Sequence, residues 1–350
     1  MELSKNDTKM LQGLSVLAMV CLHLFDRSCE GLFQPLIFFD GTPLSFYIGQ
    51  LSDFCVFGFA FLSGYGHFIQ SDRPNFYRRR LNGLLLLLCN FWIIVCIFCL
   101  VSFGVGNGKS MPGSFGEFIL NMLTLKTSYN GAWWYMFTYI LLVFLSPILM
   151  RIVKKIHPIF VIGIGFFIYC IAYYVRFNVS EVNLGNDALS AIVNEIFEKF
   201  GPFGMTLFEY LLGAVCCKLK LISKLYNIWK KPKSFIRWFT AIALIIIMLY
   251  AHTKVISSLF IAPITGFIIM MLFHFWRKPK IIVNSFLFIG KHSTNIWLTH
   301  MFFYLYIFEN FVYTAKYPIF IFIFMIAITV FVSIILNFIE KPIIKQFSKI

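Results

Sequence analysis

The stretch LQGLSVLAMVCLHLF occupies residues 11–25 and sets the interpretation of the whole chain. It is an apolar run that begins just after Lys5 and Lys9, ends at Asp26, and carries one histidine, His23, near its far end. A helix that crosses a bilayer needs about 20 mostly apolar residues, which this run and its flanks supply. An ionisable side chain well inside such a helix is costly, so His23 is a candidate functional residue.

The composition extends this interpretation to all 350 residues. Hydrophobic residues make up 59% of the chain, charged residues make up 13%, and the mean hydropathy is +0.81. No small-residue cleavage site follows the first apolar run, so we expect it to remain as a span rather than act as a signal peptide. The sequence predicts an all-α, polytopic membrane helix bundle with about ten transmembrane helices. The predicted spans are 11–27, 44–69, 81–103, 131–150, 158–176, 201–217, 236–251, 255–276, 285–312 and 318–339.

The 30 lysines and arginines are unevenly distributed over the loops between these spans. With the N-terminus inside, most of them fall in segments that lie on the inner side, including 73–80 and 218–237. Cytoplasmic loops carry such an excess of basic residues, so both termini are expected to be cytoplasmic. Basic loops that face the anionic lipid bilayer also explain the net charge of +15, and no nucleic-acid partner is expected.

No long soluble segment interrupts the spans, so residues 1–350 are expected to form a single transmembrane domain. All but one of the nine cysteines fall within spans and none has metal-ligand spacing, so neither a disulfide framework nor a metal site is expected. Apolar residues recur at helical spacing over 189–200, which predicts a helix in the outer membrane interface, either a lid or a connector. A homo-oligomer is left open.

Six short motifs follow one another in a specific order. In the first, Gln12 and Gly13 open the first span and His23 follows Gln12 by eleven positions. The others are FGFAFLSGY at 57–65, YRRRL at 77–81, WWY at 133–135, YLLG at 210–213 and NIWLTH at 295–300. Together they resemble the acyltransferase-3 family of membrane acyltransferases over nearly the whole chain. Two positions depart from that family, because Gln12 stands where it usually has arginine and 82–85 lacks a further arginine and proline.

The resemblance implies an enzyme that transfers an acyl group, usually acetyl, from cytosolic acetyl-CoA to a carbohydrate hydroxyl at or beyond the outer face. It thus implies an O-acetyltransferase of a bacterial plasma membrane that acts on a capsular or O-antigen-like polysaccharide, or on its lipid-linked precursor. The alternative is a proton-coupled transporter or exporter of a glycan or small polar solute, but such a transporter predicts repeated halves with broken helices, which the sequence does not show. A sensory or scaffold protein fits poorly with charges buried in several spans.

The candidate catalytic residues are His23 and Asp26. A neutral imidazole at His23 is able to take the proton from an acceptor hydroxyl, or to carry the acyl group itself. Asp26 follows three positions later on the same helix face and is a candidate to orient the imidazole. The structural alternatives are a hydrogen bond from His23 that packs two helices together and a hydrated helix end at Asp26.

The candidate donor-binding residues are Gln12, Arg78, Arg79, Arg80 and Lys291. Residues eleven positions apart share a helix face and lie about 16 Å apart along the axis, so Gln12 and His23 line one wall of the first span. Coenzyme A is polyanionic, and its binding site is expected to gather cations on the cytosolic side. Three consecutive arginines in a cytoplasmic loop also satisfy the positive-inside rule without any ligand.

The candidate acceptor-binding residues are Asp53, Trp133, Trp134, Tyr135, Glu209 and His300. Ionisable groups at such depth normally face a bundle interior or a water-filled cavity, and carboxylates beside aromatic rings suit a sugar. The alternative is an internal salt-bridge network that includes Arg176 or Lys316. The remaining histidines His157, His252 and His274 lie near span ends and are expected to rest in the interface.

Overall fold

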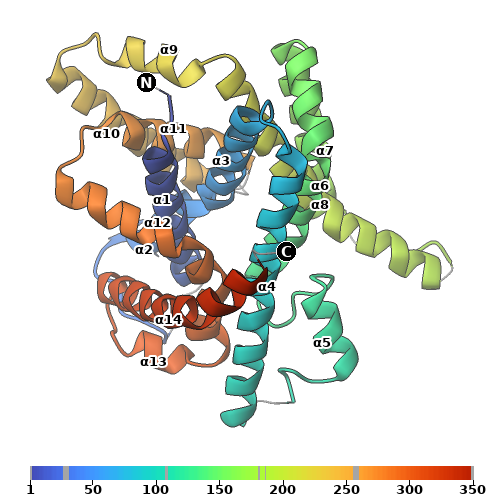
Figure 1. Cartoon of the computed structure of the whole chain (residues 1–350). Helices are drawn as coiled ribbons and strands as arrows, with labels where there is room; N and C mark the ends of the chain where they lie inside the picture. The colour runs from blue at the N-terminus through green and yellow to red at the C-terminus, as the bar shows by residue number, and fades with distance from the viewer. Residues whose placement is uncertain are drawn as a thin grey trace. The chain divides into compact units, whose positions relative to one another are not determined.

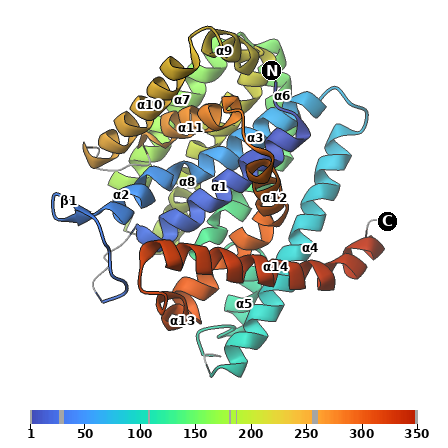
Figure 2. The ribbon, with the colours of Figure 1, turned by 90° about the vertical axis from the view of Figure 1, so that its left-hand side faces the viewer.

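The computed structural model describes residues 2–26, 31–106, 109–179, 182–185, 187–254 and 260–347. These residues fold almost entirely into helices, as Figures 1 and 2 show. Eight helices within the described ranges are long and apolar enough to cross a membrane. The prediction of an all-α, multi-pass membrane helix bundle is therefore confirmed. The end of the predicted first span at Arg27 and the start of the predicted eighth span at 255–259 lie outside the described residues.

The helices belong to two compact units that alternate along the chain. Unit 1 is made of Met1–Glu2, Phe59–Leu81 and Trp134–Ile228, and unit 2 of Leu3–Gly58, Asn82–Trp133 and Trp229–Ile350. Two helices, α3 (Cys55–Gln70) and α4 (Phe76–Gly104), contribute several residues to both units, and α9 (Leu221–Trp229) contributes its last residue, Trp229, to unit 2. The single domain over 1–350 stays a prediction.

Unit 1 contains α6 (Trp134–Lys155), α7 (Pro158–Asn178), α8 (Asp187–Lys218) and α9 (Leu221–Trp229). Its core is formed by apolar side chains of α6, α7 and α8, among them Leu142, Val161 and Tyr210. The ammonium of Lys218 donates to the carbonyls of Val153, Lys154 and Ile156 at 2.7, 3.1 and 2.9 Å. These carbonyls lack partners within α6 because its hydrogen-bond ladder ends there, so Lys218 fixes this helix end against α8.

Within unit 1, α3 and α8 meet at two glycines that face each other. A Cβ on Gly64 would overlap the carbonyl of Tyr210, and a Cβ on Gly213 would overlap the carbonyl of Phe61. Only glycine lets two helix backbones approach this closely, as small residues do at helix contacts in membranes. Gly64 of the motif at 57–65 and Gly213 of the motif at 210–213 are therefore explained by one helix crossing.

The side-chain carboxylate of Glu2, near the N-terminus, is hydrogen-bonded to two elements of unit 1. It accepts a hydrogen bond from the backbone N–H of Ser223 at 3.0 Å and another from the hydroxyl of Tyr65. Partial burial acts to raise the pKa of Glu2, but these hydrogen bonds to the ionised form outweigh it, so the pKa is held below its ordinary value.

Unit 2 begins with α1 (Lys5–Phe25), which a capping box starts. The Ser4 hydroxyl accepts from the Asp7 N–H at 3.1 Å, while the Ser4 N–H donates to the Asp7 carboxylate at 3.0 Å. Both bonds satisfy N–H groups that the first helical turn leaves without partners. The other elements are β1 (Phe38–Phe39), β2 (Thr42–Pro43), α2 (Leu44–Leu51), η1 (Ser52–Phe54), α5 (Phe115–Met122), η2 (Gly131–Trp133), α10 (Ser234–Lys254), α11 (Ala262–Phe275), α12 (Lys280–Met301), η4 (Phe302–Tyr306), α13 (Glu309–Tyr313) and α14 (Pro318–Phe347). The strands β1 and β2 pair antiparallel as a small hairpin.

A second glycine crossing joins α1 and α12, which Figures 1 and 2 both show side by side. A Cβ on Gly13 would come within 2.6 Å of the Phe286 carbonyl, and a Cβ on Gly290 would overlap the carbonyl of Lys9. Gly13 thus faces the carbonyl that lies one turn before Gly290 on α12, and Gly290 faces the carbonyl that lies one turn before Gly13 on α1. This arrangement fits two parallel helices in which Gly13 lies opposite Gly290. This register matters for the site, because His23 and His300 each lie ten residues beyond their glycine.

Several predictions about spans differ from the observed helices. The predicted interfacial helix over 189–200 is continuous with the sixth span as α8, because Pro202 does not end the helix. The predicted eighth span is represented by α11, which is too short to cross a bilayer by itself. The predicted ninth span of 285–312 is divided, because α12 ends at Met301 and passes into the π-helical turn η4 before α13 begins. Such π-helical turns often accompany functional sites.

Candidate active site

His23 and His300 are hydrogen-bonded to each other in unit 2. The Nδ1 atom of His23 lies 2.7 Å from Nε2 of His300, although the residues are 277 positions apart in the sequence. The α1–α12 crossing brings them together, since ten residues carry both side chains about 15 Å along parallel axes from the facing glycines. The sequence predicted both as site residues but did not predict that they form a pair.

The two rings of the pair differ in exposure. His300 is fully buried, whereas His23 is half-buried. The other nitrogen of His23, Nε2, has no hydrogen-bond partner among the residues that the structure describes. Tyr304, in η4, lies nearly parallel to both rings, with centroids 6.2 Å from His23 and 5.9 Å from His300. An aromatic ring therefore lies beside the pair, while Nε2 of His23 keeps its lone pair or proton free of the described residues.

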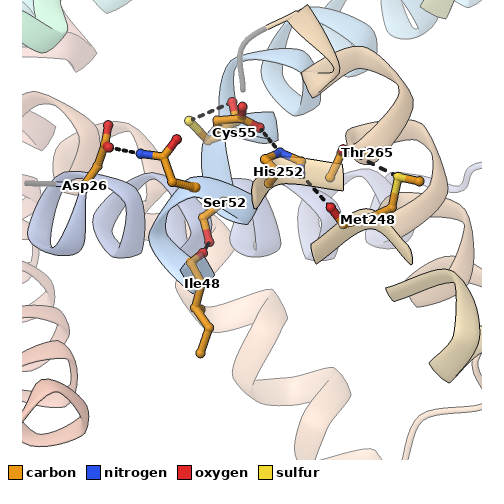
Figure 3. A network of polar contacts seen from close by, with 9 residues as sticks. Asp26, Ile48, Ser52, Cys55, Met248, His252 and Thr265 are labelled. Atoms are coloured by element: carbon orange, nitrogen blue, oxygen red, sulfur yellow. Dashed lines mark hydrogen bonds and ion pairs between the residues drawn. The ribbon is translucent and has the colours of Figure 1, made fainter. Parts of the chain in front are cut away.

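Asp26 does not orient His23, in contrast to the sequence prediction. Its carboxylate accepts a hydrogen bond from the side-chain amide of Gln50 on α2, and Figure 3 shows Asp26 in this contact. The backbone N–H of Asp26 donates to the Leu22 carbonyl at 2.8 Å and closes the last turn of α1. Asp26 thus ends the helix, and its side chain is directed to α2 instead of the imidazole.

Asp53 forms a buried pair with His252, a histidine that the sequence had assigned to the interface. Nε2 of His252 lies 3.4 Å from the Asp53 carboxylate, and its Nδ1 donates to the Met248 carbonyl at 2.8 Å (Figure 3). The side chain of His252 is 0% exposed and that of Asp53 is 1% exposed. A carboxylate held this way has little access to a sugar, so the geometry favours a structural role for Asp53, joining η1 to α10.

The remaining unit 2 candidates show different degrees of accessibility. Gln12 is half-buried on the α1 face that leads to His23, and Lys291 is exposed on α12. Trp133 is 1% exposed, and its indole N–H donates to the Leu298 carbonyl at 3.0 Å. Phe91 and Phe302 pack edge-on against its ring, so the geometry favours a packing role for Trp133 over the predicted contact with a sugar.

The three consecutive arginines of unit 1 are not equivalent. Arg78 and Arg79 are exposed, and the Arg79 guanidinium donates to the Pro74 carbonyl of its own loop at 2.5 Å. Arg80 is half-buried, donates to the Gln70 side chain at 2.9 Å, and has a buried Nε without a hydrogen-bond partner among the described residues. The guanidinium interacts electrostatically with the buried rings of His67 and Tyr210 and with the half-buried ring of Tyr139. The sequence could not separate Arg80 from its two neighbours.

A second polar cluster of unit 1 contains the remaining acceptor candidates. The guanidinium of Arg176 lies 5.3 Å from the ring centroid of half-buried Trp134, and its charge acts on the buried Glu209. This supports the alternative that Glu209 belongs to an internal network with Arg176. Tyr135 is buried next to Tyr139, with nearly parallel rings 6.3 Å apart. Of the two aromatic candidates Trp134 and Tyr135, Trp134 is thus the more accessible.

Two further sets of polar contacts in unit 2, one at His274 and one at Asn90, were not predicted from the sequence. His274 is 3% exposed and lies 3.5 Å from the Asp7 carboxylate, a contact that its predicted place near a span end did not reveal. Asn90 of α4 donates to Asn295 of α12 at 2.7 Å, and Asn295 donates to Asn337 of α14 at 3.5 Å. These pairs join residues far apart in the sequence, and no local spacing pattern could have revealed them.

The fold and the pair of His23 and His300 define a multi-pass membrane protein with a candidate base in its interior. The family model described as Acyltransferase domain, Acyl_transf_3, matches residues 8–338. Because that match covers nearly the whole chain, the protein belongs to the acyltransferase-3 family and is a membrane acyltransferase. No curated protein and no solved structure matches the chain.

Proposed function

We propose that this membrane acyltransferase is an O-acetyltransferase that moves an acetyl group from cytosolic acetyl-CoA to a hydroxyl of a cell-surface carbohydrate in a bacterial plasma membrane. The acceptor class is a capsular or O-antigen-like polysaccharide, or its lipid-linked precursor. The observation that carries the proposal is the available Nε2 of His23, in a ring that the buried His300 holds from the other side.

The chemistry requires one base and balances without any other reactant. Nε2 of His23 takes the proton of the acceptor hydroxyl while that oxygen attacks the thioester carbonyl. A new C–O bond forms, the C–S bond breaks, and the imidazolium returns its proton to the departing sulfur. The products are the O-acetylated carbohydrate and free coenzyme A, and His23 ends in its starting form.

The donor and the acceptor each have a supporting feature in unit 1. Arg80 offers a guanidinium that is only partly satisfied within the protein, and arginine binds phosphate groups through several N–H donors. Trp134 offers an aromatic face next to Arg176, a combination suited to a sugar ring with hydroxyls at its edge. Gln12 is able to donate a hydrogen bond on the α1 face but supplies no charge.

Analysis of surface glycan tests this function directly. O-acetyl content is measured in cells with the intact chain, with the gene deleted, and with His23→Ala. We expect loss in both altered strains, and normal O-acetyl content after deletion would contradict the function. In membrane vesicles, label from acetyl-CoA supplied on the cytosolic side should appear in glycan. Transport of an already acetylated glycan without such labelling would favour an exporter.

A further inference from the structure

The hydrogen bonds of His300 determine which of its nitrogens carries the proton. Nδ1 of His300 lies 2.8 Å from the Trp297 carbonyl of its own helix. A carbonyl oxygen only accepts, so Nδ1 of His300 must carry the hydrogen. In a neutral imidazole the other nitrogen is then an acceptor. His300 therefore presents the lone pair of Nε2 to its neighbour, His23.

The same logic continues to His23. Because Nε2 of His300 accepts, Nδ1 of His23 must be the donor across the 2.7 Å contact. The rings lie 7° from parallel with centroids 4.9 Å apart. Two ring radii of about 1.1 Å each, added to the N–N distance, account for this separation, so the rings are side by side in one plane as an N–H···N bond requires. His23 is left with its proton on Nδ1 and a bare lone pair on Nε2.

We propose that His300 is a positioning residue, which holds His23 in the Nδ1–H tautomer so that Nε2 is always the basic nitrogen. This assignment replaces the acceptor-binding role that the sequence predicted for His300. Its kinetic consequence rests on the proposed function, whereas the tautomer itself does not. When Nε2 of His23 receives a proton, the Nδ1–H bond becomes charge-assisted and stronger, so His300 also stabilises the imidazolium that forms during the reaction.

The surroundings hold His300 rigid enough for this role. Its ring is fully buried, and α12 is fixed to α1 by the crossing at Gly13 and Gly290. Tyr304, on the π-helical turn that follows α12, lies at an interplanar angle of 18° to the His300 ring. A buried ring with one nitrogen bonded to its own helix cannot turn over without losing that bond, so the order of donors and acceptors is fixed.

Three substitutions at His300 separate positioning from general stability. In His300→Gln the side-chain carbonyl is able to accept from Nδ1 of His23, so we expect kcat within about tenfold of the parent. His300→Leu offers no acceptor and should lower kcat by about 100-fold or more, with KM for acetyl-CoA unchanged. His300→Lys offers only donors, forces the other tautomer on His23, and should be at least as inactive as His300→Leu. Thermal melting in detergent verifies that each variant is folded.

Nitrogen-15 NMR of histidine-labelled protein reads the tautomer without any substrate. The difference between the parent and His23→Ala assigns the His23 signals among the seven histidines. We expect the pyrrole-type signal of His23 at Nδ1 and the pyridine-type signal at Nε2, retained in His300→Gln. A proton on Nε2 in the parent, or full kcat in His300→Leu, would overturn the inference. If the parent protein transfers no acetyl group, the proposed function fails, while the NMR result still decides the tautomer.

Discussion

At the scale of single residues, the arginine cluster gives the sharpest contrast. Arg80 is turned partly into unit 1, whereas the adjacent Arg79 is exposed and bonded to its own loop. If Arg80 binds the donor's phosphates, Arg80→Ala should raise KM for acetyl-CoA about tenfold or more, because a charge-assisted hydrogen bond contributes about 1.5–3 kcal/mol. Arg79→Ala is the matched control and should change KM less than about twofold. Equal increases in KM for the two substitutions would indicate that the donor responds only to the total charge of the arginine cluster.

The buried pair of Asp53 and His252 leads to a prediction about stability. Asp53→Ala leaves a buried imidazole without its partner and should lower the free energy of unfolding by about 1–3 kcal/mol. The double variant Asp53→Leu with His252→Leu removes both polar groups and should recover much of the loss. Thermal melting of the purified protein in detergent measures both. If the double variant lost as much stability as the sum of the losses in Asp53→Leu alone and His252→Leu alone, this would argue against the pairing.

These residues show how far sequence could reach at this scale. Local spacing identified His23, the arginines and His300, because motifs and membrane depth are properties of short segments. The partners of His23 and Asp53 lie on other helices, 277 and 199 positions away. Depth in a span predicts that a charge has a partner but does not predict which one. Likewise, the sequence suggested that Trp133 contacts a sugar because it does not show that Phe91 and Phe302 enclose the Trp133 ring.

At the scale of elements, two of the three glycines of α3 have opposite surroundings. Gly64 touches the backbone of α8, whereas no atom lies within 4 Å of a Cβ placed on Gly66. Gly64→Ala should therefore destabilise the protein by about 1–3 kcal/mol through overpacking. Gly66→Ala is the matched control and should be neutral or stabilising by up to about 1 kcal/mol, the difference in helix propensity. Thermal melting of the two variants in the same detergent decides, and equal melting temperatures would contradict the crossing.

The helices were more predictable than their ends. Apolar length located the spans well, because a bilayer imposes nearly the same requirement on each of them. The division of 285–312 at Met301 was not visible, since the residues of η4, FFYLY, are as apolar as a continuing helix. The continuity of α8 through Pro202 was missed because proline usually ends a helix rather than lying within it.

At the scale of the whole molecule, we expect Glu2 to make the stability of the folded protein depend on pH in the acidic range. Its pKa is lowered in the folded state, so its ionised form stabilises the fold above the ordinary pKa, and this contribution is lost as the pH falls through the lowered value. At neutral pH, Glu2→Gln should melt at a lower temperature than the parent. The difference should shrink as the pH falls below about 4.5 and vanish once the carboxyl is protonated. Melting curves over a pH series measure it, and a difference independent of pH would refute the ionic contribution.

The orientation of the chain in the membrane is a prediction that belongs to the molecule as a whole. The distribution of basic loops predicts that both termini lie in the cytoplasm, and membership of the family does not by itself test this prediction. Reporter fusions at each end address this, and activity of a periplasm-specific reporter at either end would contradict it.

The paired glycines Gly64 and Gly213 have a mechanical consequence. Two helices whose backbones touch at one point can neither slide past each other nor move closer, and the freedom that remains is a change in their crossing angle. We therefore expect any opening of unit 1 around a substrate to be a scissor-like rotation of α3 against α8, with its pivot at this glycine pair.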